Sequence, residues 1–401
     1  LSLNFGTLSL NSLAVGTAGT YADTKSGTLA FLGSTPTIQM ASVNVVVNSQ
    51  IIGTTGLGAA GPGTLVLAGS NAYTGGTNIS NVSTVLVGNA GTTGNLGAGD
   101  VANSGSLVMN RSDSMLIPNL ITGPGSLRQS GTGTSILTAD NSYTGGTTIS
   151  AGALQVGNGG TTGAVGSGSI VDNGALIINH SDDLVFGTVV SGTGSLTHAG
   201  SGNLTLTANN TYSGATVISS GTLQVGNGGT VGSLGAGSVA ANGALVFNRS
   251  DGVVVNSQIT GIGSLTQSGS GTLTLLGSNT YGGGTFINAG TLQVGNGGII
   301  GSLGTGNVTN TGGLIFNRSD TISVAVPIGG AGGVTQAGTG TVIVTANNTY
   351  SGPTTISSGT LQVGNNGISG SLGSGSVANN GALVFAHSDN IVVANLLSGT
   401  G

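Results

Sequence analysis

The chain has 401 residues, of which 81 are Gly, five are Lys or Arg, ten are Asp or Glu and none is Cys. The lack of Cys excludes disulfides, thiolate metal sites and cysteine nucleophiles, and a net charge of −5 without a basic stripe argues against nucleic-acid binding. Disordered chains combine low hydropathy with high net charge, whereas the mean hydropathy here is positive, so we expect a buried core.

The beginning of the chain matches the later pattern poorly. Residues 26–53 resemble the end of a repeat, because VVVNSQI at 45–51 returns at 253–259. We predict degenerate N-terminal coils over 1–53, followed by five tandem repeats of about 69 residues over 54–401 in one continuous solenoid. Both ends look cut, since the final LLSGTG continues into a new repeat in earlier copies, and we expect a section of a longer chain.

One stretch recurs along nearly the whole sequence. GTLTLLGSNTYGGGTFINAGTLQVG at 271–295 has counterparts at 133–157, 202–226 and 340–364, and a looser copy starts at Gly63. Such a regular recurrence indicates a repeat architecture. The period is fixed by one tyrosine in each copy, and the five tyrosines are Tyr73, Tyr143, Tyr212, Tyr281 and Tyr350.

Each repeat reads as short strands. Apolar and polar residues alternate in GTLTLL, GTLQVG and GGLIF, and a period of two is typical of strands. The aligned residues Leu273, Leu292 and Leu314 of these strands are expected to point inward. The next aligned position is Val342, the counterpart of Leu273 in the following repeat. Because the intervals between these positions differ, we predict three coils of unequal length in each repeat.

No segment shows helical periodicity, and the strands are separated by corners rich in Gly, Asn and Ser. Gly226, Gly295 and Gly364 are each followed by Asn and suit corners with positive φ. Parallel strands need long crossover connections, which the rest of each coil would provide. The sequence thus predicts an all-β fold, a parallel β-solenoid that is stabilised by the stacking of many coils.

The pattern GTLTLxGxNTYSGGTTIxxGTLQVG resembles the passenger-associated transport repeat, or autotransporter-associated β-strand repeat, of Gram-negative autotransporters. The resemblance covers about 350 residues. It implies a right-handed parallel β-helix (β-solenoid) that a C-terminal β-barrel translocator of the full-length protein carries across the outer membrane. It also implies an extracellular location at the bacterial cell surface, often as an adhesin or stalk.

A polar tripeptide also recurs once in each repeat. Ser, His and Asp invite comparison with a catalytic triad, but a triad needs groups that converge from different segments, and an extended tripeptide turns its middle residue away. We predict instead that the first and third residues form an exposed ion pair, which contributes about 0–1 kcal/mol to stability. The tripeptides are Arg111-Ser112-Asp113, His180-Ser181-Asp182, Arg249-Ser250-Asp251, Arg318-Ser319-Asp320 and His387-Ser388-Asp389.

We predict no catalytic, cofactor-binding or metal-binding residues and no cofactor. The ten Asp form no calcium nonapeptide or EF-hand loop. His180, His198 and His387 have no second His at i+2 or i+4. A polysaccharide lyase on the same fold would need clustered carboxylates or Arg, and no repeat has them. The sequence leaves the ligand-binding residues unknown.

The function predicted is a non-enzymatic structural or adhesive rod, either displayed at the cell surface or fibre-forming. Three alternatives stay open: a glycan-binding or glycan-degrading passenger, an ice-binding solenoid, and a passive transport or spacer module. The ice-binding alternative depends on a flat hydroxyl face formed by outward threonines, for which the candidates are Thr205, Thr207, Thr272 and Thr274. Expected partners are host-surface or matrix glycans or proteins, and no nucleic acid.

Self-association is expected as well, end to end or laterally. Apolar runs such as ALVF at 244–247 do not alternate, so that one apolar residue in each repeat faces outward. We predict that these residues form a sparse apolar stripe, and that uncapped coils leave open backbone edges. The residues of the predicted stripe are Val108, Ile177, Val246, Ile315 and Val384.

Overall fold

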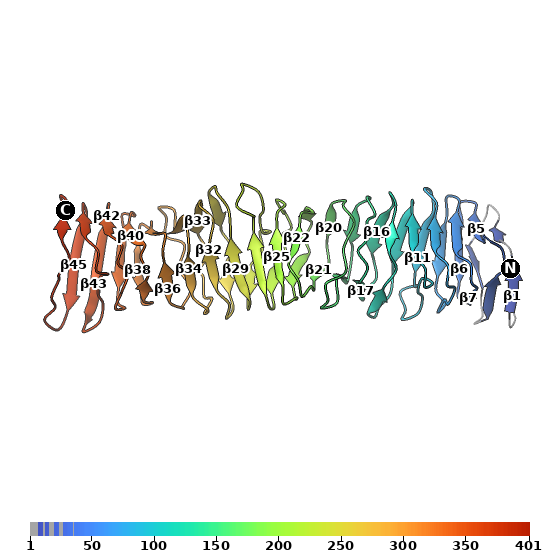
Figure 1. Ribbon diagram of the computed structural model, residues 1–401, viewed down its shortest axis with the longest axis horizontal. Coiled ribbons are helices and arrows are strands. Elements are labelled where there is room, and N and C mark those ends of the chain that lie inside the picture. The colour runs from blue at the N-terminus through green and yellow to red at the C-terminus, as the bar shows by residue number, and fades with distance from the viewer. Residues whose placement is uncertain (1–6, 11–12, 16–19, 24–26, 35) are drawn as a thin grey trace. The chain divides into compact units, whose positions relative to one another are not determined.

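A computed structural model describes residues 7–10, 13–15, 20–23, 27–34 and 36–401. In these ranges the chain forms strands and turns and no helix (Figure 1). It folds as two compact units, one of residues 1–182, 188–201 and 211–214, and the other of residues 183–187, 202–210 and 215–401. The described part of the region predicted as degenerate coils, 1–53, lies in the first unit, and the rest of that region lies outside the described residues.

The first unit holds parallel strands in four sheets. The smallest sheet contains β1 (Thr7–Leu10), β4 (Thr28–Phe31) and β7 (Gln50–Ile52). The second contains β2 (Leu13–Val15), β5 (Thr37–Met40), β8 (Leu57–Ala60), β10 (Thr77–Ile79), β12 (Val101–Asn103) and β15 (Ile121–Thr122). The third contains β3 (Thr20–Ala22), β6 (Asn44–Val47), β9 (Thr64–Leu67), β11 (Thr84–Val87), β13 (Ser106–Met109), β16 (Ser126–Gln129), β18 (Thr147–Ile149), β20 (Ile170–Asp172) and β23 (Val190–Ser191). The fourth contains β14 (Met115–Ile117), β17 (Thr134–Leu137), β19 (Ala153–Val156), β21 (Ala175–Ile178) and β24 (Ser195–His198).

The second unit repeats this arrangement. One group of its strands is β26 (Thr216–Ile218), β28 (Val239–Ala241) and β31 (Ile259–Thr260). The next is β22 (Leu184–Phe186), β25 (Asn203–Leu206), β27 (Thr222–Val225), β29 (Ala244–Phe247), β32 (Leu265–Gln267), β34 (Thr285–Ile287), β36 (Val308–Asn310) and β39 (Ile328–Gly329). A third is β30 (Val253–Val255), β33 (Thr272–Leu275), β35 (Thr291–Val294), β37 (Gly313–Phe316), β40 (Gly333–Gln336), β42 (Thr354–Ile356), β44 (Val377–Asn379) and β46 (Leu397–Ser398). The last is β38 (Thr321–Val324), β41 (Thr341–Val344), β43 (Thr360–Gly367) and β45 (Ala382–His387).

Successive coils stack in parallel, which confirms the predicted β-solenoid. The chain passes through β38, β39 and β40, each in a different sheet, before β41 pairs with β38. Each coil therefore has three sides. Leu273 pairs with Leu292 and Leu292 with Leu314, as the sequence predicted, and all three side chains are buried.

The order after Leu314 differs from the prediction. Leu314 pairs with Val334, which comes before Val342 in the chain, and Val342 pairs with Ile322 instead. The cause is β38, a strand that the sequence analysis did not count as a separate side. A repeat therefore takes about three coils and one further side, and each new repeat begins on the next face. In the second unit the counterparts Leu204, Leu273 and Val342 lie in three different sheets.

Because each repeat begins on the next face, the predicted apolar stripe does not form. Val246, Ile315 and Val384 lie on β29, β37 and β45, which belong to three different sheets. In the first unit Val108 is buried. The outward apolar residues therefore do not line up, because equivalent positions in consecutive repeats face different directions.

Candidate functional site

The recurring tripeptide folds as an anchor for a long surface loop. β29 ends at Phe247, and Arg249 then turns back over residues 226–232, the loop that follows β27. The guanidinium donates from Nε and Nη2 to the two carboxylate oxygens of Asp251, at 2.8 and 2.6 Å, and from Nη1 to the Gly232 carbonyl at 2.5 Å. This two-pronged geometry is the strong form of an arginine–carboxylate pair.

Three repeats use the same arginine anchor. Arg111 donates to Asp113 and to the Gly94 carbonyl, and Arg318 donates to Asp320 and to the Gly301 carbonyl. Each arginine therefore joins a corner of one coil to a loop that lies 17 residues earlier in the chain.

Histidine occupies the anchor position in the other two repeats. Nδ1 of His180 lies 3.0 Å from Asp182, and Nε2 donates to the Gly163 carbonyl at 2.8 Å. Nδ1 of His387 lies 3.2 Å from Asp389. The imidazole of His180 thus reaches both kinds of partner that the guanidinium reaches, whereas Nε2 of His387 is buried and has no hydrogen-bond partner among the described residues.

A glycine makes room for each anchor. Gly226 has φ of +79°, and a Cβ placed there would lie 2.6 Å from Cγ of Arg249. Gly295 and Gly364 have φ of +81° and +80°, so the predicted positive φ is confirmed at all three corners. These glycines serve both the turn and the close approach of the anchoring side chain.

The structure confirms the predicted pairing but not its exposure. The side chains of Arg111, Arg249 and Arg318 are only 16%, 12% and 13% exposed, because the loop covers them. The hydrogen bond from Arg249 lowers the pKa of Asp251 below its usual value. Each guanidinium nitrogen of Arg249 bonds to the carboxylate or to the loop, so the arginine pins the loop to the corner of the next coil.

The regular recurrence of the tyrosines has a physical basis that the sequence analysis missed. Tyr281 is buried, its hydroxyl lies 2.8 Å from Oγ1 of Thr285, and burial raises its pKa to about 12. Two residues earlier, Asn279 accepts from the Ile259 amide at 2.9 Å and donates to the Ser302 carbonyl at 2.7 Å. The asparagine therefore joins three consecutive coils. The recurrence of Asn-x-Tyr in every repeat was the sequence signal for this contact.

Asp172 is a second feature that sequence reasoning missed. Its side chain is fully buried, one oxygen accepts from the Gly174 amide at 2.9 Å, and burial raises its pKa to about 6. In two other repeats the equivalent residues are Asn103 and Asn310, which donate to the carbonyls of Ser126 and Gly333. An ionised carboxylate only accepts hydrogen bonds. Asp172 can therefore donate a bond to the next coil, as these asparagines do, only when it is protonated.

The hydroxyl face needed for ice binding does not form. Thr205 and Thr274 are only 5% and 8% exposed. They also lie on β25 and β33, which belong to different sheets. The threonines of consecutive repeats therefore present no shared flat surface.

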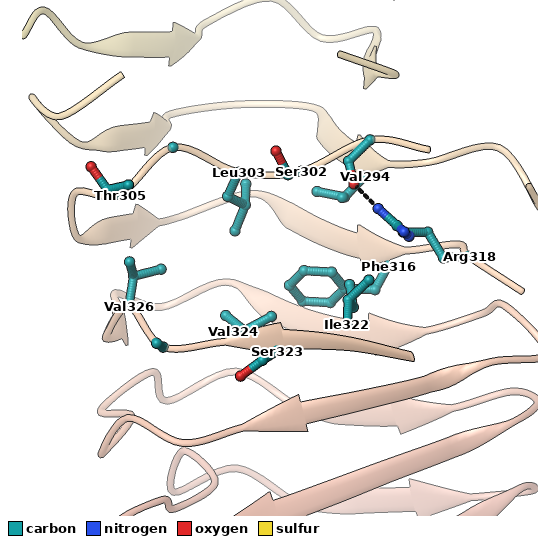
Figure 2. Close-up of a pocket in the computed structure, with 13 residues that line it drawn as sticks. Val294, Ser302, Leu303, Thr305, Phe316, Arg318, Ile322, Ser323, Val324 and Val326 are labelled. Carbon is teal, nitrogen blue, oxygen red and sulfur yellow. Dashed lines mark hydrogen bonds between the residues drawn. The ribbon is translucent and has the colours of Figure 1, made fainter. Parts of the chain in front are cut away.

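A groove lies beside the strand that begins a new sheet. In the second unit it holds about 500 Å³ between the loop of residues 301–305 and β38, and Figure 2 shows Phe316 between these two walls. In the first unit an equivalent groove of about 490 Å³ lies between residues 95–98 and β14. The same hollow therefore occurs in at least two repeats.

Metal sites and membrane-spanning helices are absent from the described residues. Within the described ranges, no three His, Cys, Asp or Glu side chains gather closely enough to hold a metal ion. The described residues also contain no apolar helix of membrane-spanning length.

Comparisons with known proteins agree with these features. The family model described as passenger-associated-transport-repeat matches five stretches, at residues 59–81, 127–156, 196–225, 265–294 and 334–363. The chain is also similar to a protein named "Adhesin BmaC autotransporter" from Brucella suis biovar 1 (strain 1330), with 33% identity over 503 aligned positions. That alignment covers 94% of this chain and 14% of the relative, so the chain spans only a small part of that protein's length. No solved structure matches the chain.

The five repeats and the relative agree on one assignment. Passengers of this kind are displayed on the outer surface of the bacterium, and that location applies to this chain. The chain belongs to the autotransporter passengers that are built from passenger-associated transport repeats.

Proposed function

We propose that this chain is an adhesive section of a surface-displayed passenger and that it acts by binding and not by catalysis. The relative's name describes an adhesin, which supports this role. The proposal includes the finer role of a structural rod or fibre, self-association end to end or laterally, and a C-terminal translocator in the full-length protein.

Exposed apolar loop tips carry the proposal. The tips of the loops pinned by the tripeptides carry side chains that project into solvent. In the loop pinned by Arg318, Ile299 is 67% exposed and Ile300 is 51% exposed. Val231 and Ile368, in the loops of the preceding and following repeats, are 50% and 77% exposed. Conformationally fixed loops on a rigid scaffold commonly carry binding function, and apolar side chains at such tips offer area for contact with a host or matrix surface.

The adhesive role is tested with beads coated with the purified chain. We expect more beads to attach to cultured epithelial cells than beads coated with serum albumin. Changing Ile299 and Ile300 together to Thr, which copies Thr161 and Thr162 of an earlier repeat, should reduce attachment by about threefold or more, because it removes apolar contact area.

The matched control changes Thr161 and Thr162 together to Ser and should leave attachment unchanged. Equal attachment of chain-coated and albumin-coated beads would overturn the adhesive role. Attachment unaffected by the isoleucine changes would show that the loop tips do not carry it.

A further inference from the structure

β38 has an open edge inside the solenoid. It is the first strand of its sheet, and it pairs only with β41 of the following coil among the described residues. The preceding coil passes this face as the loop of residues 295–307, which is not a strand. The same situation occurs at β14, which begins a sheet in the first unit and pairs only with β17 in the described chain.

The backbone of β38 presents unused hydrogen-bonding groups on this edge. Thr341 donates to the Asp320 carbonyl and Thr345 to the Val324 carbonyl, both at 3.1 Å. Alternate residues of a parallel strand bond to the same neighbour, so Ser323 and Ala325 direct their N–H and C=O groups to the opposite side. In the described part of the chain, neither residue has a backbone partner there.

These groups face the groove of about 500 Å³. Val294 and Phe316 lie beneath the groove and are buried, whereas Leu303 on the opposite wall and Ile322 on β38 are partly exposed (Figure 2). The charged groups at its end, Arg318 and Asp320, bond to each other. The groove therefore offers partly exposed apolar walls, a row of backbone donors and acceptors, and a charged pair at its end whose members bond to each other.

We propose that this groove binds an extended, uncharged peptide segment of a partner protein, which adds to the edge of β38 as a strand. Strand addition gives affinity through backbone bonds and selectivity through alternate side chains. The loop of residues 301–305 lies opposite the open edge, so an added strand would have a loop on its other side, which favours a single extended peptide over the edge of a second folded copy. Small apolar side chains at alternate positions would contact the partly exposed Leu303 and Ile322.

The first repeat contains a natural variant of this edge. Pro118 stands where the fourth repeat has Ala325, and Pro118 also lines the equivalent groove. Proline has no N–H and blunts strand edges. The groove beside β38 should therefore bind a peptide better than the groove beside β14.

The test uses the complete chain and a blocked peptide, acetyl-GTLQVGN-amide, whose sequence is that of residues 290–296. Its Leu and Val lie on one side of an extended strand. In amide NMR spectra, we expect saturable shifts at Thr321, Ser323 and Ala325. The Ala325→Pro variant should weaken binding at this groove by about tenfold, because it removes a backbone donor.

Two comparisons keep the test decisive if Ala325→Pro folds poorly. The same peptide with Gln replaced by Pro should not bind the unchanged protein, and Pro118→Ala should strengthen shifts around Leu116. Absence of shifts at millimolar peptide, or binding that tolerates proline in the peptide, would overturn the proposal. The inference deepens the proposed function and rests on it only for its biological use: peptide binding without bead attachment would reject adhesion and keep the groove, and the reverse result would reject the groove alone.

Discussion

Arg249→Ala is expected to lower the free energy of unfolding by about 1–3 kcal/mol and to loosen the loop of residues 226–232, because the buried Gly232 carbonyl loses its donor. The arginine stem also packs beneath this loop, and its contacts are lost with the side chain. Urea unfolding measures the total effect. The rate of hydrogen exchange at the Gly228 amide, which bonds to the Asn248 carbonyl, measures how often the loop opens.

Two substitutions control this experiment. Arg128 is exposed, and within the described ranges it donates only to the Ser150 hydroxyl, at 3.0 Å, so Arg128→Ala should change stability by less than about 0.5 kcal/mol. Arg249→His copies the residue used at His180, and it should keep most of the protection of the Gly228 amide. If Arg249→Ala and Arg128→Ala had equal effects, the pin would be an ordinary surface pair.

Asp172→Asn is expected to stabilise the protein by about 2–3 kcal/mol at pH 7.5, since a pKa of about 6 against an ordinary value of 3.8 corresponds to about that penalty. The asparagine amide can also donate to the next coil, as Asn310 does. The folded-state pKa is raised, so the contribution of Asp172 to stability is complete below about pH 4 and is lost as the pH rises through about 6.

Unfolding of both proteins between pH 3.5 and 8 measures this dependence. The gain from Asp172→Asn should be small at pH 3.5 and reach its full size above pH 7. Asn310→Asp is the matched reverse change, and it should destabilise the chain mainly at neutral pH. A gain in stability that stays constant across this pH range would mean that burial does not raise the pKa of Asp172.

The sequence predicts much of the strand layout for a simple reason. The alternation in GTLQVG assigns Leu292 and Val294 to the interior, and both are buried. A period of two is local information, so it does not depend on how coils are placed. The number of sides in a repeat is not local, because it depends on whether residues 321–324 turn a corner or continue the previous side.

The site was less predictable for a related reason. The pairing of Arg249 with Asp251 follows from their spacing, but the burial of Arg249 depends on a loop that returns from 17 residues earlier. Asp172 stands two residues after the buried Ile170 in a strand. Its inward direction was therefore readable from the period. The groove beside β38 could not be read in this way, because it arises where a loop and not a strand lies on the preceding coil.

The central structural claim is that a repeat takes three coils and one further side. The chain has no cysteine, so no native thiol competes with an engineered pair of cysteines for disulfide formation. Ile315 pairs with Thr335 in the structure, whereas three coils per repeat would place Ile315 beside Ile343. Paired residues on adjacent strands lie about 4.8 Å apart, within the Cα separation of about 4.4–6.8 Å that a disulfide needs. After mild oxidation of the folded protein, mass spectrometry should find a disulfide in Ile315→Cys/Thr335→Cys and none within Ile315→Cys/Ile343→Cys. A disulfide in the second pair and none in the first would contradict the register and the advance by one face in each repeat.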